Sequence, residues 1–261
     1  MRLFPGNLFI SLVKELKADC VCDVGSMDGR EALRFRSALP DATIFAFEPN
    51  PHNFQAIEGD PEIASADIRL VQAAVAGVDG TLGFNIADAD YNDRNANRGL
   101  SSLMIGETAV RETINVRSLR LDRFLSDAGE FSTIALWVDV EGAAFEALLG
   151  SEGILQRVCC IHTEVETREF FKGQKTFDEV KRFLGDRGFV ETASEYWFAR
   201  GQGNVLFIRD VPAATLFKCK FRAAIISLLL LASVPFKKAA QFLLGGSVYR
   251  GLKRFYLRRL V

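Results

Sequence analysis

The sequence holds few of the residues on which metal and disulfide chemistry depend. Its 261 residues include five cysteines and two histidines, and no two cysteines form a C-x-x-C pair. Four of the cysteines lie in apolar runs, where a free thiol behaves as a small hydrophobic side chain. The first residues also lack the apolar core and cleavage site of a signal peptide. These absences argue against a zinc cluster and favour a reducing, cytoplasmic compartment.

Acidic residues are absent from the last part of the chain. Residues 211–261 hold ten lysines and arginines and no acid, whereas the first 210 residues hold the other 22 bases and all 33 acids. The chain therefore divides into an acidic domain, residues 1–210, and a basic tail, residues 211–261.

A long apolar run is also lacking in the tail. Residues 223–234 are twelve in number and include two serines, whereas a bilayer-spanning helix needs about 20 apolar residues. Residues 250–260 place arginines on one helical row and Leu252, Tyr256 and Leu260 on the opposite row. We predict a basic amphipathic helical tail that lies on an anionic membrane surface. A helical hairpin packed on the body or on another subunit is the alternative, and nucleic acid is not expected because the body is acidic.

Apolar strands alternate with helical segments along the domain, which predicts a doubly wound α/β fold with a mostly parallel sheet. The pattern starts with a helix at residues 8–17 and ends with a hairpin of two strands joined at residues 201–203. A polar loop, residues 88–106, interrupts it between two further strands. We expect strands at residues 20–24, 43–47, 68–76, 81–87, 114–121, 134–140, 158–164, 190–192 and 205–208, and helices at residues 30–39, 143–149 and 177–188.

The dinucleotide-binding glycine pattern is missing after the first strand. Starting from Gly25, it would need glycines at the positions of Met27 and Arg30. The sequence instead has Asp23, Gly25 and Gly29 around this turn, and a second acid, Glu48, at the end of the next strand. Such an acid can accept hydrogen bonds from ribose hydroxyls. The combination indicates a nucleoside cofactor without a pyrophosphate, as in S-adenosylmethionine. The alternative is that Asp23 and Glu48 are turn and cap residues.

Seven segments in order resemble the FkbM-type methyltransferase family. They are residues 21–33, 45–53, 71–84, 98–103, 118–125, 138–150 and 161–166. The resemblance covers about residues 20 to 210. It implies a Rossmann-like class I methyltransferase fold with a seven-stranded sheet, S-adenosylmethionine as cofactor, and O-methylation of sugars or other hydroxylated compounds. Within these motifs we also expect Ser26, Pro49, Asn50 and Ala73 to bind the cofactor. Ala144 departs from the family, which commonly has Glu there, and Glu146 stands nearby.

Acids follow the ends of several predicted strands. Because ligands of open α/β sheets lie beyond the carboxyl ends of the strands, we expect Asp139, Glu141 and Glu164 in the active site. His162 is a further candidate for the general base, since it shares a strand face with Glu164. Alternatively, the three acids bind a divalent cation or cap helices. Ser101 and Ser102, in the polar loop, could contact the substrate or cover the cofactor.

Three functions compete on these features. The leading one is an O-methyltransferase, peripheral to a membrane, that acts on a saccharide or lipid-linked glycan. A non-catalytic module that binds an adenosyl ligand and is tethered to a membrane or partner is the second. A nicotinamide-dependent oxidoreductase is the third, and the missing glycines disfavour it.

Overall fold

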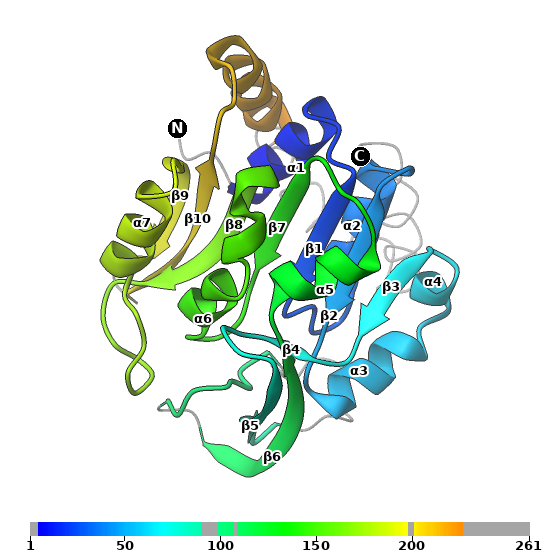
Figure 1. Cartoon of the computed structure of the whole chain (residues 1–261), viewed down its shortest axis with the longest axis vertical. Coiled ribbons are helices and arrows are strands. Elements are labelled where there is room, and N and C mark those ends of the chain that lie inside the picture. Colours follow the sequence, from blue (N-terminus) through cyan, green and yellow to red (C-terminus); the bar gives the residue numbers. More distant parts are fainter. Residues whose placement is uncertain (1–4, 90–98, 107–108, 198–200, 227–261) are drawn as a thin grey trace, which may run out of the picture.

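A seven-stranded sheet forms the centre of the molecule (Figure 1). The computed structural model describes residues 5–89, 99–106, 109–197 and 201–226, and within them the strand order is β3-β2-β1-β7-β8-β10-β9. All neighbours are parallel except β10, which is antiparallel to both β8 and β9. The predicted Rossmann-like sheet with an antiparallel final hairpin is therefore confirmed. The strands are β1 (Cys20–Val24), β2 (Thr43–Phe47), β3 (Ile68–Val71), β7 (Ile134–Val138), β8 (Val158–Glu166), β9 (Val190–Trp197) and β10 (Gln202–Ile208).

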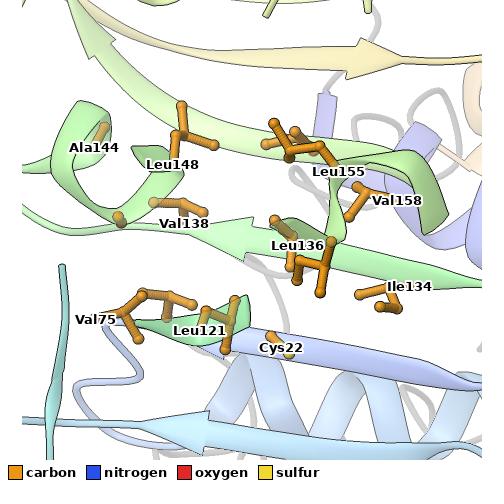
Figure 2. Packing of buried hydrophobic residues seen from close by; sticks show 14 of the residues in the cluster. Cys22, Val75, Leu121, Ile134, Leu136, Val138, Ala144, Leu148, Leu155 and Val158 are labelled. Atoms are coloured by element: carbon orange, nitrogen blue, oxygen red, sulfur yellow. The ribbon is translucent and has the colours of Figure 1, made fainter. Parts of the chain in front are cut away.

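Helices cover both faces of this sheet, which explains why its central strands are mostly apolar. On one face, α1 (Pro5–Glu15) and α2 (Arg30–Ala38) pack on side chains such as Val21 and Trp137. On the other face, Cys22 and Leu136 meet Leu121, Leu148 and Leu155 (Figure 2). The elements over this second face are α5 (Leu121–Ala128), α6 (Ala144–Leu149), the 3-10 helix η1 (Glu152–Arg157) and α7 (Phe177–Gly185). At the outer edge, α3 (Pro51–Glu58) and α4 (Pro61–Ala64) connect β2 to β3 (Figure 1).

A second sheet of three strands lies over the carboxyl ends of the parallel strands (Figure 1). It contains β4 (Ala74–Val75), β5 (Gly80–Ala87) and β6 (Val110–Leu119), in the order β4-β6-β5. The prediction of one strand over residues 68–76 is therefore wrong. The chain turns at Ala73, whose N–H bonds the carbonyl of Val71, and then pairs with β6 instead of β2.

Several other element ends also differ from the predictions by a few residues. The first helix begins at Pro5, and α7 ends at Gly185 rather than at residue 188. The strand predicted for residues 114–121 runs from Val110 to Leu119, because Leu121 already begins α5. The strand predicted for residues 190–192 extends to Trp197. As the edge strand β9 pairs only with β10, its polar side chains need no burial on the second side.

The described part of the tail packs on the body. Residues 213–226 are helical, and both Cys219 and Ala223 are fully buried against α1. Lys218 and Arg222 form ion pairs with Glu15, at 2.6 and 2.9 Å. No helix among the described residues is long and apolar enough to cross a membrane. The predicted basic helix at residues 250–260 and most of the apolar run lie outside the described residues.

Candidate active site

A cleft of about 260 Å³ opens at the carboxyl ends of β1, β2, β7 and β8, beneath the three-stranded sheet. Glu48 lines the cleft, and Asp139, Glu141 and Glu164 contribute three more carboxylates to its lining. Apolar lining residues include Phe47 and Phe84. The cleft thus has the location expected for a ligand site of an open α/β sheet.

The turn after β1 fits closely against the end of β7. Gly25 has a φ of 87°, and a Cβ added there would lie 1.9 Å from the carbonyl oxygen of Asp139. Glycine is therefore required at this position by backbone packing as well as by conformation. Gly29 has a φ of 73°, and a Cβ there would lie 2.4 Å from Ile63 Cδ1. Its backbone consequently packs on α4.

Glu48 connects two backbone segments of the cleft. Its carboxylate accepts hydrogen bonds from the N–H groups of Met27 and Asn50, both at 2.8 Å, and from the side chain of Asn53. Burial raises the pKa of Glu48 to about 7, against the effect of these hydrogen bonds. Asn50 in turn caps α3 through a 3.0 Å bond from the His52 N–H. Glu48 therefore fixes the turn after β1 and still lines the cleft, where its remaining lone pairs can accept hydrogen bonds from ribose hydroxyls.

Asp23 and Ser26 form a buried pair behind the turn. The Ser26 hydroxyl donates to the Asp23 carboxylate at 2.7 Å, and Asp23 is only 1% exposed. Burial raises the pKa of Asp23 to about 8, with Ser26 opposing the shift. Neither residue lines the cleft.

The eight predicted cofactor residues thus divide into two groups. Those that line the cleft are Gly25, Glu48, Pro49 and Ala73. Those that lie behind it and support its walls are Asp23, Ser26, Gly29 and Asn50.

Asp139, Glu141 and Glu164, here called the acid cluster, all line the cleft. Burial is the main cause of a raised pKa in each, to about 6, about 7 and about 8 respectively. Repulsion among the carboxylates adds to the shift of Glu141, from Asp139 and Glu166, and to that of Glu164, from Asp139 and Glu141. The free cluster therefore retains protons near neutral pH, and a cationic ligand would favour its ionised form.

His162 does not reach the cleft. Its ring stacks on Trp137 with 3.5 Å between ring centroids and packs against Phe9 of α1. The side chain is 3% exposed, and burial lowers its pKa to about 3. His162 and Glu164 share a strand face as predicted, but His162 pairs with Trp137 in the register and so lies deeper under α1. The structure therefore does not support His162 as the general base.

The polar insertion contributes residues to the cleft that carried only a weak signal in the sequence. Ser101, Ser102 and Leu103 line it, and the Ser102 hydroxyl donates to the carbonyl of Glu141. The Ser101 hydroxyl accepts from the Ala87 N–H at 3.0 Å. This segment therefore ties the insertion to the acid cluster and covers the cleft. The cleft-lining residues that the sequence did not single out as ligand contacts include Met27, Phe47, Asn53, Phe84 and Ala143.

Two alternatives from the sequence find no counterpart in the described residues. No group of three histidine, cysteine or acidic side chains there could hold a metal ion. Ala144 is buried in the core, and Glu146 does not line the cleft. Glu146 therefore does not replace the acid that the family commonly has at Ala144.

Comparison with known proteins identifies the family. The model of the methyltransferase FkbM domain matches residues 23–191. The chain belongs to the FkbM methyltransferase family. It is 28% identical over 163 residues to the 2-O-methyltransferase NoeI of Sinorhizobium fredii, which is 59% of this chain and 66% of that protein. The match thus spans just under two thirds of the relative's length.

Solved structures of low sequence identity also match the FkbM chain. Magnesium protoporphyrin IX methyltransferase (ChlM) from Synechocystis PCC 6803, with bound SAM, has a TM-score of 0.41 at 12% identity, covering 73% of this chain and 69% of that one. Precorrin-6y C5,15-methyltransferase from Geobacter metallireducens has a TM-score of 0.40 at 11% identity, covering 77% and 86%.

The predicted family and its cofactor, S-adenosylmethionine, are confirmed by the family match. The residues that line the cleft fit this cofactor. Glu48 can accept hydrogen bonds from the ribose hydroxyls, and the carboxylates of the acid cluster can stabilise a sulfonium cation. The predicted cofactor contacts at individual residues stay predictions.

Proposed function

We propose that this FkbM-family protein catalyses methyl transfer from S-adenosylmethionine to a hydroxyl group of a saccharide or lipid-linked glycan. The observation that carries the proposal is the acid cluster, three carboxylates with raised pKa values in one cleft with Glu48. The similarity to a 2-O-methyltransferase supports a hydroxyl acceptor and favours the 2-hydroxyl.

We assign separate roles to the acids of the cluster, which their raised pKa values near neutral pH permit. When bound, the cofactor supplies an electrophilic methyl group on a sulfonium. Asp139, with a pKa of about 6, is the most acidic member and carries the negative charge that balances the sulfonium. Glu141, with a pKa of about 7, accepts the proton of the acceptor hydroxyl, since a base works best with a pKa near the operating pH. Glu164, with a pKa of about 8, is protonated in the free cleft and releases its proton when the sulfonium cation binds.

Substitution of the base tests this assignment. Glu141→Gln is expected to lower the transfer rate by about 10²-fold or more, while the Kd for S-adenosylhomocysteine changes little. Glu146→Gln is the matched control, because Glu146 is also partly buried with a raised pKa but lies outside the cleft lining. Equal rates for the two variants would remove Glu141 from the proton-transfer step.

The acceptor class is tested with labelled S-adenosylmethionine and a panel of neutral oligosaccharides, each paired with its 2-deoxy counterpart. Transfer to the members that retain the 2-hydroxyl, and not to their 2-deoxy counterparts, is the expected result. Tight binding of the cofactor without transfer to any member would support the non-catalytic binding module instead.

We further propose that the enzyme is cytoplasmic and acts at an anionic membrane surface. The support is the charge of the tail, with ten bases and no acid in residues 211–261. Flotation of the full chain with anionic vesicles, and its loss on truncation after Asp210, is the expected result. Equal flotation of both forms would exclude membrane binding by the tail.

A further inference from the structure

One face of the helix at residues 213–226 is apolar and open to solvent. Phe217 is 74% exposed, Phe221 61% and Ile225 43%. These residues are spaced four apart, so they form one stripe along the helix. Cys219 and Ala223, which pack on α1, are each two positions from a stripe residue and so lie on roughly the opposite side. Packing of the helix on the body therefore leaves the stripe, which holds the two most exposed phenylalanines among the described residues, uncovered by the rest of the described chain.

The charge around this stripe favours an anionic lipid surface as its occupant. Lys218 and Arg222 flank it, with side chains about half exposed even though both pair with Glu15. The chain that follows carries further bases, no acid, and the apolar residues 223–234. Exposed aromatic side chains beside clustered bases, in a tail segment that holds no acid, are the composition of helices that lie in the interface of anionic membranes.

The stripe and the cleft lie toward opposite ends of the sheet. Glu164, near the carboxyl end of β8, lines the cleft, whereas β10 ends at Ile208, opposite Cys160 near the start of β8. The chain leaves the sheet at this start, where the Arg209 N–H bonds the carbonyl of Cys159, and then enters the helix. Figure 1 shows the helix at the top of the molecule and the three-stranded sheet over the cleft at the bottom.

The distribution of charge acts in the same direction. All 33 acids belong to the first 210 residues, which hold 22 bases, whereas the tail holds ten bases and no acid. Anionic lipids therefore attract the tail, at the end of the sheet opposite the cleft, and repel the acidic body. We propose that Phe217, Phe221 and Ile225 insert into an anionic bilayer surface and that the cleft consequently faces the aqueous phase. This inference rests on the proposed membrane association and adds an orientation to it.

The orientation restricts the acceptor. A hydroxyl held within the headgroup layer would lie at the wrong end of the molecule. The acceptor therefore has to be a soluble saccharide, or a glycan long enough to extend well beyond the lipid surface.

Flotation tests the contact face directly. The full-length chain is mixed with vesicles of equal parts phosphatidylglycerol and phosphatidylcholine, and with phosphatidylcholine alone. Phe217→Ser combined with Phe221→Ser is expected to lower binding to the anionic vesicles by about tenfold or more, because two aromatic side chains no longer enter the bilayer. Val190→Ser is the matched control, since Val190 is 64% exposed on the edge strand β9, and it should bind as the unaltered chain does. An unchanged Kd for S-adenosylhomocysteine shows that the double variant is folded.

Quenching by brominated lipid tests the orientation. Tryptophan is introduced in the stripe, as Phe217→Trp, or at the insertion that covers the cleft, as Ile105→Trp; Ile105 is 63% exposed and accepts the Lys172 N–H. Additional quenching, relative to the unaltered chain, is expected for the first variant alone. Quenching of the second alone would overturn the orientation, and quenching of neither with flotation intact would overturn the stripe as the contact. Failure of the unaltered chain to float would instead overturn the proposed membrane association itself.

Discussion

The raised pKa values of the acid cluster predict that the enzyme distinguishes its charged donor from its neutral product in a pH-dependent way. In the free protein, Asp139, Glu141 and Glu164 have pKa values of about 6, 7 and 8, so the cluster holds protons near neutral pH. A sulfonium cation favours the ionised carboxylates and lowers these pKa values. Binding of S-adenosylmethionine therefore releases protons, and its affinity should rise with pH up to about 8. S-adenosylhomocysteine is a neutral thioether at this position and lacks this effect.

The size of the effect follows from Coulomb's law. A unit charge about 5 Å from a carboxylate contributes about 3 kcal/mol at an effective dielectric constant of about 20. This energy corresponds to about two pKa units. If one carboxylate of the cluster titrates in response, the ratio of the product Kd to the donor Kd should increase by about 100-fold between about pH 6 and about pH 8.

Calorimetric titration of both ligands over this range measures the ratio. The amino acid and adenosine groups are common to the two ligands, so their own titration largely cancels. Glu164→Gln should flatten the dependence, because it removes the carboxyl with the highest pKa of the cluster. Glu146→Gln, outside the cleft lining, should leave it unchanged. Parallel affinity curves for the two ligands would refute the reasoning, as would a flattened curve for the control variant alone.

Three further predictions concern the support of the site and of the fold. Gly25→Ala and Gly173→Ala both place alanine at a positive φ, but only the Cβ of the first overlaps backbone atoms. Urea denaturation should therefore show that Gly25→Ala is at least about 3 kcal/mol less stable than Gly173→Ala, and similar losses for the two variants would count against the close approach to β7. His162→Phe should keep the pH profile of methyl transfer, because His162 stacks on Trp137 away from the cleft, and loss of the acidic limb of the profile would restore it as the base. Arg36→Met should lower the free energy of unfolding by about 2–4 kcal/mol without changing the Kd for S-adenosylhomocysteine, since the guanidinium donates to the carbonyls of residues 40, 42, 66 and 67.

Free-protein stability follows from the same carboxyl groups. An acid whose pKa is raised by folding binds more protons in the native state than in the unfolded state, so stability falls as pH rises from the unfolded pKa, about 4, to the native value. For Asp23, Glu48 and the acid cluster the native values are about 6 to 8. Bound S-adenosylmethionine should offset this loss, because its cation stabilises the ionised cluster.

The sheet could be predicted because burial on both faces makes its central strands short and largely apolar. Cys20 to Val24 and Ile134 to Val138 are fully buried strands, and each is followed by a helix or a turn with a distinct start signal. The division of residues 68–76 could not be predicted in this way. It depends on Ala74 and Val75 pairing with Ser118 and Leu119, about 40 residues further along the chain, and local composition carries no sign of this pairing.

The acids of the site could be predicted because the carboxyl ends of parallel strands meet at one edge. The alternation of side chains along a strand also predicted that His162 and Glu164 share one face of the sheet. It does not show how far each residue lies from the end of the strand, and only the register with Trp137 shows that His162 is covered by α1. For the same reason the sequence did not separate Gly25, which lines the cleft, from Gly29, whose backbone packs on Ile63.

The arrangement of charge suggests how one cleft can bind its cofactor and release the product. In the proposed reaction, methyl transfer removes the positive charge from the sulfur, while the hydroxyl proton passes to a carboxylate of the cluster. Both changes act on Asp139, Glu141 and Glu164 together: the cation that favoured their ionised forms is gone, and one of them carries a new proton. The interaction that strengthens donor binding is therefore absent from the product complex, whereas the hydrogen bonds of Glu48 at the other part of the cleft are unaffected. Selectivity for donor over product is thus expected to depend on the acid cluster, and binding of the adenosine part, common to both, on Glu48.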